Sequence, residues 1–244
     1  MRSLQLVKHD LISIFKSPLT YIAFILVIGL TVFQAVMMAN YSPGHKVDYT
    51  MVFIMANWLF LFAGLLFIIK TITRDYSQGT IQLYMNKMSS RIGYIVAKTI
   101  SMILISFLFT LVQYIVIIVI ESTTKGKSID GDNFLTNIWF YLIFFLFFGL
   151  FLFLITLAVE KPAVIFTLGI FLLLIVPFIQ PLVGLIPNIG DDIHKSFKYI
   201  PFTYLTQKMT ESDVSFTHWQ WFISIASIVV LFIVNVLYAA KRDI

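Results

Sequence analysis

The chain alternates between long apolar runs and short polar segments. Six of the runs contain no Asp, Glu, Lys or Arg, and they lie at 19–39, 51–69, 99–120, 136–159, 163–186 and 219–239. Each run has about the ~20 residues that a helix needs to cross the hydrocarbon core of a bilayer. Because one charge at the bilayer centre costs about 2.5 to 3.5 kcal/mol, their absence predicts an all-α polytopic membrane protein with six transmembrane helices.

Composition and charge support a membrane protein. Of the 244 residues, 59% are hydrophobic and 12% charged, against about 25% charged in soluble domains. The chain has no cysteine, which excludes disulfides, thiolate zinc sites and iron-sulfur clusters. The net charge of +5 comes from residues at the ends of the apolar runs. This distribution indicates membrane topology, and no nucleic-acid partner is predicted.

The polar segments predict the orientation. The side that carries both termini holds 11 of the 17 Lys and Arg residues, whereas the other side holds 8 of the 12 acidic residues. Positive charge is retained on the cytoplasmic side, so both termini are predicted to be cytoplasmic. The Lys-, Ile- and Phe-rich composition is typical of a low-GC Gram-positive bacterium, and the expected location is its cell membrane.

Residues 1–18 form a separate amphipathic segment before the membrane domain at 19–244. Its apolar residues recur at helical spacing up to Ser17-Pro18, and they are Leu4, Val7, Leu11, Ile14 and Phe15. Such a helix lies in the cytoplasmic interface, where it contacts membrane lipids. A membrane-hugging anchor is the simpler interpretation, and contact with a partner subunit is the alternative.

The segment 70–98, called the coupling segment below, carries five of the basic residues on the cytoplasmic side. Ile81, Met85 and Met88 give it a short amphipathic stretch, and Gly79 can end the preceding helix. We predict a short helix at the cytoplasmic surface, continuous with two membrane helices. A solvated loop whose basic residues only enforce topology is the alternative.

This segment resembles a known motif. ABC-2-type transporter permeases carry E-x-x-x-G-T, then P-x-S-R, then G-K between their second and third helices. The matching residues here are Asp75, Gly79-Thr80, Ser90-Arg91 and Lys98. The chain departs from the motif in having Asp75 in place of Glu, Met88 in place of Pro and Ala97 in place of Gly. The first change keeps the carboxylate, and the other two concern local geometry.

The resemblance implies a function. In ABC-2-type permeases the short helix is a coupling helix that docks in a cleft of an ATP-binding subunit. By position, the coupling residues would be Arg74, Asp75, Gly79, Thr80 and Arg91, with Asp75 as the acidic one. The chain has no G-x-x-x-x-G-K-[ST] sequence, so ATP and Mg are expected on a separate ABC ATPase and no enzymatic activity or bound cofactor is expected here. The permease would act as a homodimer or as a heterodimer with a second permease.

The fourth run concentrates aromatic residues. Phe140, Phe144, Phe148 and Phe151 fall on one helical face. They either line a pathway for the substrate or pack against helices and lipid. A charge-free, Phe-rich interior suits an amphipathic peptide or a lipid-like molecule. The chain is also similar to permeases that export phenol-soluble modulins, which are short cytolytic peptides; exporters for immunity to antimicrobial peptides are the nearest alternative.

The remaining features leave alternatives open. Pro177 and Pro181 in the fifth run predict either a kinked span or a re-entrant segment. An interfacial outer segment is expected to follow at 187–218, with inward-facing residues at Ile193, Phe197, Tyr204 and Met209. Asp191-Asp192-x-His194 is interpreted as a solvated acidic loop, so no metal site is predicted. An ion-coupled transporter or channel, or an intramembrane enzyme, would keep ionisable residues inside its spans, and none lies there. The side-chain amides within the runs are expected to join helices by hydrogen bonds; they are Gln34, Asn57, Gln113, Gln180 and Asn235.

Overall fold

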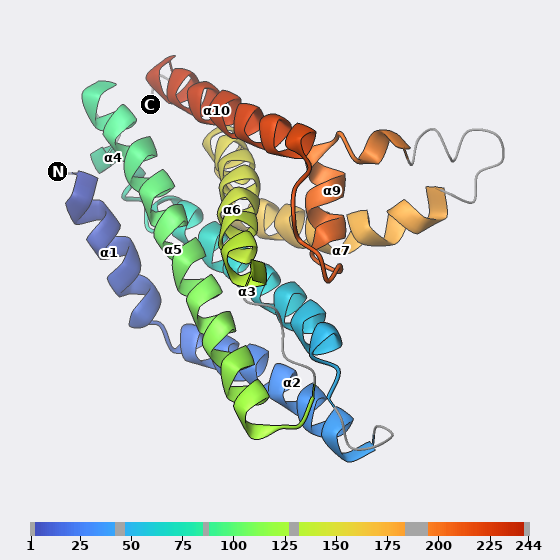
Figure 1. The fold of residues 1–244 in the computed structure, drawn as a ribbon. Coiled ribbons are helices and arrows are strands. Elements are labelled where there is room, and N and C mark those ends of the chain that lie inside the picture. Colours follow the sequence, from blue (N-terminus) through green and yellow to red (C-terminus); the bar gives the residue numbers. More distant parts are fainter. Residues whose placement is uncertain (1–2, 42–46, 85–87, 127–131, 184–194, 242–244) are drawn as a thin grey trace.

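The protein is built of helices (Figure 1). A computed structural model describes residues 3–41, 47–84, 88–126, 132–183 and 195–241. The helices are α1 (Ser3–Phe15), α2 (Pro18–Tyr41), α3 (Tyr49–Ser77), α4 (Ile81–Tyr84), α5 (Met88–Thr123), α6 (Asp132–Val159), α7 (Pro162–Val183), α9 (Pro201–Lys208) and α10 (His218–Lys241). A single β-bridge, between Val47 and Gly126, interrupts this pattern within the described ranges. The all-α prediction is confirmed.

Within the described residues, five helices are long and apolar enough to cross a membrane, namely α2, α3, α5, α6 and α10. They indicate a membrane-embedded protein. The fifth apolar run forms α7 (Pro162–Val183). The backbone stays helical past Pro177 and Pro181, over 22 residues in all. These prolines therefore do not end the helix, and residues 184–194 lie outside the described part.

The helices are buried to very different extents. In the most apolar 18-residue stretch of α3, 72% is buried inside the protein, whereas the corresponding share is 17% in both α2 and α10. Figure 1 shows α3 and α6 in the middle of the molecule and α2 and α10 at opposite edges. The N-terminus and the end of α10 lie at the same end of the molecule. The orientation of the two ends relative to a membrane stays a prediction.

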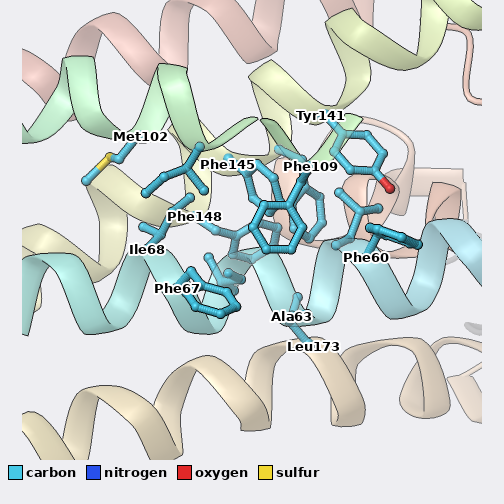
Figure 2. Packing of buried hydrophobic residues seen from close by; sticks show 14 of the residues in the cluster. Phe60, Ala63, Phe67, Ile68, Met102, Phe109, Tyr141, Phe145, Phe148 and Leu173 are labelled. Atoms are coloured by element: carbon cyan, nitrogen blue, oxygen red, sulfur yellow. The ribbon is translucent and has the colours of Figure 1, made fainter. Parts of the chain in front are cut away.

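Aromatic rings connect the central helices. Phe109 of α5 lies 5.1 Å from the ring of Phe24 in α2, 5.5 Å from Phe67 in α3 and 6.2 Å from Phe145 in α6. Figure 2 shows Phe67, Phe109 and Phe145 in one cluster. Gly64 of α3 permits this approach, because a Cβ atom at that position would overlap the Phe145 ring.

Side-chain amides add hydrogen bonds between these helices. Gln113 Nε2 donates to Asn57 Oδ1 at 2.9 Å, and Asn137 Nδ2 donates to Gln113 Oε1 at 2.7 Å. These two bonds, called the amide ladder below, join α3, α5 and α6. Asn235 Nδ2 of α10 donates to the Leu150 carbonyl at 3.0 Å, and Gln34 Nε2 of α2 donates to the Met51 carbonyl at 3.4 Å. The predicted role of four amides is confirmed; the Gln180 side chain lies outside the described residues.

Candidate functional site

Four charged side chains from three helices meet inside the protein, near the ends of α3 and α5 that flank α4. Arg74 Nη2 lies 2.6 Å from Asp10 Oδ1 and 3.3 Å from Asp75 Oδ1. Lys98 Nζ lies 3.0 Å from Asp10 Oδ1 and 2.7 Å from Asp75 Oδ2. Each carboxylate therefore contacts both cations, and the four formal charges sum to zero. We call Asp10, Arg74, Asp75 and Lys98 the charge network.

Neutral groups complete the charge network. The Ser101 hydroxyl lies 3.0 Å from Asp10 Oδ2, and the Tyr94 hydroxyl donates to Asp75 Oδ2 at 2.8 Å. Lys98 also donates to the Thr71 carbonyl at 2.9 Å. The four charged side chains are at most 8% exposed. Buried charges cost least when they are both paired and hydrogen-bonded. All four charged groups are paired, although the Nε atom of Arg74 has no hydrogen-bond partner among the described residues.

The charge network joins α1, α3 and α5. Withdrawing an ion from water costs several kcal/mol, and removing one partner of a buried pair typically costs about 3–5 kcal/mol because a charge is left uncompensated. Moving any one of the three helices away would separate opposite charges in a place that water does not reach. These helices are therefore held together by more than apolar contact.

A tight turn and a short exposed helix follow the charge network in the chain. α3 ends at Ser77, and Gly79 has a φ of +65°, a left-handed conformation that glycine adopts without strain. Leu83 of α4 is 77% exposed. On its other side, α4 is attached by the Tyr84 ring, which stacks on Tyr94 at 5.7 Å. The Tyr94 hydroxyl in turn donates to Asp75, so Tyr94 connects α4 to the charge network.

Arg91 attaches the start of α5 to the end of α10. Its Nη1 atom lies 3.3 Å from the carbonyl oxygens of Ala239 and Ala240. The last carbonyls of a helix have no partner within the helix and carry partial negative charge, so a guanidinium there is favourable. The coupling segment is thus connected to α10 as well as to α1.

The predicted coupling residues fall into two groups. Gly79 is exposed, Thr80 and Arg91 are half-buried, and all three lie at or near the surface that carries α4. Arg74 is 8% exposed and Asp75 1% exposed, and both are bonded within the chain. Helix α3 also extends two turns beyond the apolar run that ends at Ile69, because Arg74 and Asp75 are paired inside the protein.

Sequence reasoning missed Asp10. The residue lies between Val7 and Ile14 on the face of α1 that packs inward, and its exposed fraction is 0%. Leu4 and Phe15, which were predicted on that same face, are exposed instead. An acidic residue at helical spacing from two buried aliphatic residues was the signal, since it requires a buried cation as partner. Arg74 and Lys98 both supply such a cation.

The aromatic stripe of α6 packs inside the protein. Phe140, Phe144 and Phe148 have an exposed fraction of 0%, and Phe144 lies 4.7 Å from Phe148. Phe151 is half-buried against Phe202 of α9, at 4.8 Å. Helix packing accounts for these contacts, and a role in a substrate pathway stays a prediction.

The outer segment confirms part of a further prediction. Ile193, Phe197, Tyr204 and Met209 were expected to face inward. Tyr204 and Met209 are 2% and 0% exposed, and Phe197 is half-buried. Ile193 lies outside the described residues, as do Asp191, Asp192 and His194 of the acidic loop. The helix α9 is therefore packed on the bundle.

A groove of about 550 Å³ lies between α2, α3 and α7. Its lining is mainly apolar and includes Met51, Met55, Trp58, Leu173 and Phe178. Gln34 adds a polar group, because its Oε1 atom is buried and has no hydrogen-bond partner among the described residues. Met side chains adapt to irregular partners, so the groove suits an apolar occupant of variable shape.

Comparison with known proteins places the chain in a family. The family model DUF2705, described as a protein of unknown function, matches residues 12–244. The chain belongs to the DUF2705 family. The match covers nearly the whole of this DUF2705 protein, including Arg74, Asp75 and Lys98, and it begins two residues after Asp10. No curated protein matches the chain. The resemblance to ABC-2-type permeases therefore stays a prediction.

Proposed function

We propose that this protein is the membrane subunit of an ATP-driven ABC exporter. The observation that carries the proposal is the exposed α4, with Leu83 77% exposed, which is attached to a buried charge network of zero net formal charge. An exposed apolar side chain on a short helix offers a contact surface for another protein. Its attachment through Tyr84, Tyr94 and Asp75 means that force applied to α4 passes to α3 and α5.

In this proposal Asp75 supports the coupling helix from inside the permease. Its carboxylate is occupied by Lys98 and Tyr94, so Leu83 and the other exposed residues of α4 make the contact with the ATPase subunit. ATP binding on two such subunits draws two coupling helices together and opens the pathway to the outside. The ATP and Mg are bound by the partner, and a homodimer or a pair of related permeases forms the pathway.

The proposed cargo is an amphipathic or hydrophobic molecule, such as a cytolytic or antimicrobial peptide. The apolar groove between α2, α3 and α7 supports this class of cargo, because its apolar lining would bind the apolar face of such a peptide. With three of its Phe residues packed in the core, the stripe on α6 offers less accessible surface than the groove.

A secondary transporter driven by an ion gradient is the second candidate. The buried carboxylate of Asp75 in α3 favours it, since ionisable groups within membrane helices often take part in ion coupling. The carboxylates of Asp75 and Asp10 are both paired with cations, however, and the charge network is neutral as it stands. Dependence on ATP or on an ion gradient separates the two candidates.

The test uses the protein in proteoliposomes with the ABC ATPase subunit that this proposal requires, captured by pull-down of the expressed chain. We expect the wild type to bind the ATPase, to raise its rate of ATP hydrolysis and to move an amphipathic peptide. Leu83→Asp should abolish binding and stimulation, whereas Gln78→Asp, which adds the same charge at an exposed position next to α4, should preserve both. Transport without the ATPase, or full stimulation by Leu83→Asp, would contradict the proposal.

A further inference from the structure

We infer that Asp10 is a positioning residue that makes α1 move together with the coupling segment and so carries that movement into α2. This inference rests on the proposed function, because it concerns where movement of the coupling segment goes. Its basis is the set of contacts that attach α1 and the start of α2 to α3 and α5.

Asp10 attaches α1 to two other helices at once. Its Oδ1 atom contacts Arg74 of α3 at 2.6 Å and Lys98 of α5 at 3.0 Å, and its Oδ2 atom contacts Ser101 of α5 at 3.0 Å. Leu6 and Val7 beside it are buried. An amphipathic helix that only rests on a membrane surface needs no buried carboxylate, so α1 is built into the bundle through this residue.

Charge balance makes this attachment obligatory. Without Asp10, Arg74 and Lys98 would share the single carboxylate of Asp75, and a net positive charge would remain inside the protein. Leaving a buried charge uncompensated is strongly unfavourable. When α3 and α5 move with the coupling segment, α1 therefore moves with them.

The connection continues from α1 into α2. The Thr20 hydroxyl at the start of α2 donates to the Ile14 carbonyl of α1 at 2.6 Å. Lys70 of α3 donates to the Ser17 hydroxyl at the junction of the two helices, at 2.7 Å. Helix α2 also packs along α3 and α5, where the Phe24 ring stacks on Phe67 at 6.2 Å and on Phe109 at 5.1 Å. The start of α2 is thus attached to α1 and α3 together, and it follows them when they move with the coupling segment.

The first experiment measures coupling in the complete transporter. Asp10→Asn, reconstituted with the ATPase subunit, should reduce the amount of peptide moved per ATP hydrolysed at least about fivefold, the lower range of coupling between distant sites. The matched control is Gln113→Leu, which breaks the buried amide ladder. It should lower thermal stability and leave the coupling ratio unchanged.

Several results would overturn the inference. A wild-type coupling ratio in Asp10→Asn would do so, and so would equal losses of coupling in Asp10→Asn and Gln113→Leu at equal losses of stability. If Leu83→Asp abolishes ATPase stimulation while Asp10→Asn keeps full coupling, the inference alone fails. If Leu83→Asp has no effect, the proposed function fails first. If Asp10→Asn does not fold, Ser101→Ala replaces it, because this variant removes a contact to Asp10 and no charge. Its coupling ratio should fall by less than about fivefold. An unchanged coupling ratio in Ser101→Ala would count against the inference.

The second experiment measures movement in a protein that keeps all four residues of the charge network. Since the protein has no cysteine, spin labels can be placed by two substitutions at a time. The distance between labels at Lys8→Cys on α1 and Gln78→Cys next to α4 should be the same with and without ATP. The distance between Lys8→Cys and Trp219→Cys on α10 should change. A change in the first distance, or none in the second, would contradict the inference.

Discussion

Replacing Lys98 with Met tests whether the charge network behaves as one neutral unit. The Lys98 side chain is 0% exposed, and its ammonium group contacts Asp10, Asp75 and the Thr71 carbonyl. Methionine fills nearly the same space without a charge. After the substitution, Arg74 alone faces two carboxylates, and the buried site carries one net negative charge.

The expected loss follows from these contacts. Hydrogen bonds to charged groups contribute about 1.5 to 3 kcal/mol each, but these bonds and the ion pairs describe the same interactions and cannot be added. The relevant comparison is the removal of one partner from a buried pair, which costs about 3–5 kcal/mol. We therefore expect Lys98→Met to lower the free energy of unfolding by about 3–5 kcal/mol. Adding Asp75→Asn restores neutrality and should recover about 2 kcal/mol, within the range measured for contacting pairs.

The assay is reversible unfolding in mixed detergent micelles, applied to the wild type, both single variants and the double variant. Lys8→Met, which removes an exposed cation from α1, is the control and should change stability by less than about 1 kcal/mol. The reasoning is refuted if Lys98→Met loses no more than this control. It is also refuted if the two substitutions add independently, because contacting charges in one site must couple.

Three further substitutions test the packing around the site. Gly64→Ala places a methyl group against the Phe145 ring and should cost about 1–3 kcal/mol in unfolding experiments, partly recovered by Phe145→Leu; a neutral effect would mean that the two helices are not in close contact. Gln113→Leu removes both bonds of the amide ladder, at about 0.6 kcal/mol each on average, so thermal unfolding should show a loss near 1 kcal/mol and not a gain. Gly79→Ala meets no neighbouring atom but must adopt a positive φ, so it should lose about 1–2 kcal/mol, and Gly79→Asn should lose less; equal losses would place the cause elsewhere.

The membrane helices can be predicted from the sequence, because the length of an apolar run is a property of one continuous segment. Five of the six predicted runs are long apolar helices, and the predicted end of α3 near Gly79 is confirmed. The short helix after Gly79 was also predicted, although the described part of α4 ends at Tyr84. In each case the deciding information, an uninterrupted run or a residue that tolerates positive φ, lies within one segment.

The partners of the charged residues do not follow from the sequence in the same way. Asp75 was predicted from a resemblance to face another subunit, yet its carboxylate is bonded to Lys98, 23 positions further along the chain. Asp10 and Ser101 are separated by 91 positions and lie 3.0 Å apart. Such contacts depend on how α1 lies across α3 and α5, which no local pattern specifies.

The sequence by itself determined that this chain forms long apolar helices with a charged segment between two of them, because an uninterrupted apolar run can be recognised within one segment. The tertiary structure decided which charges meet. An ion can be buried only beside an opposite charge, and that requirement is met by residues from three separate helices, so the charge network exists only once those helices have packed.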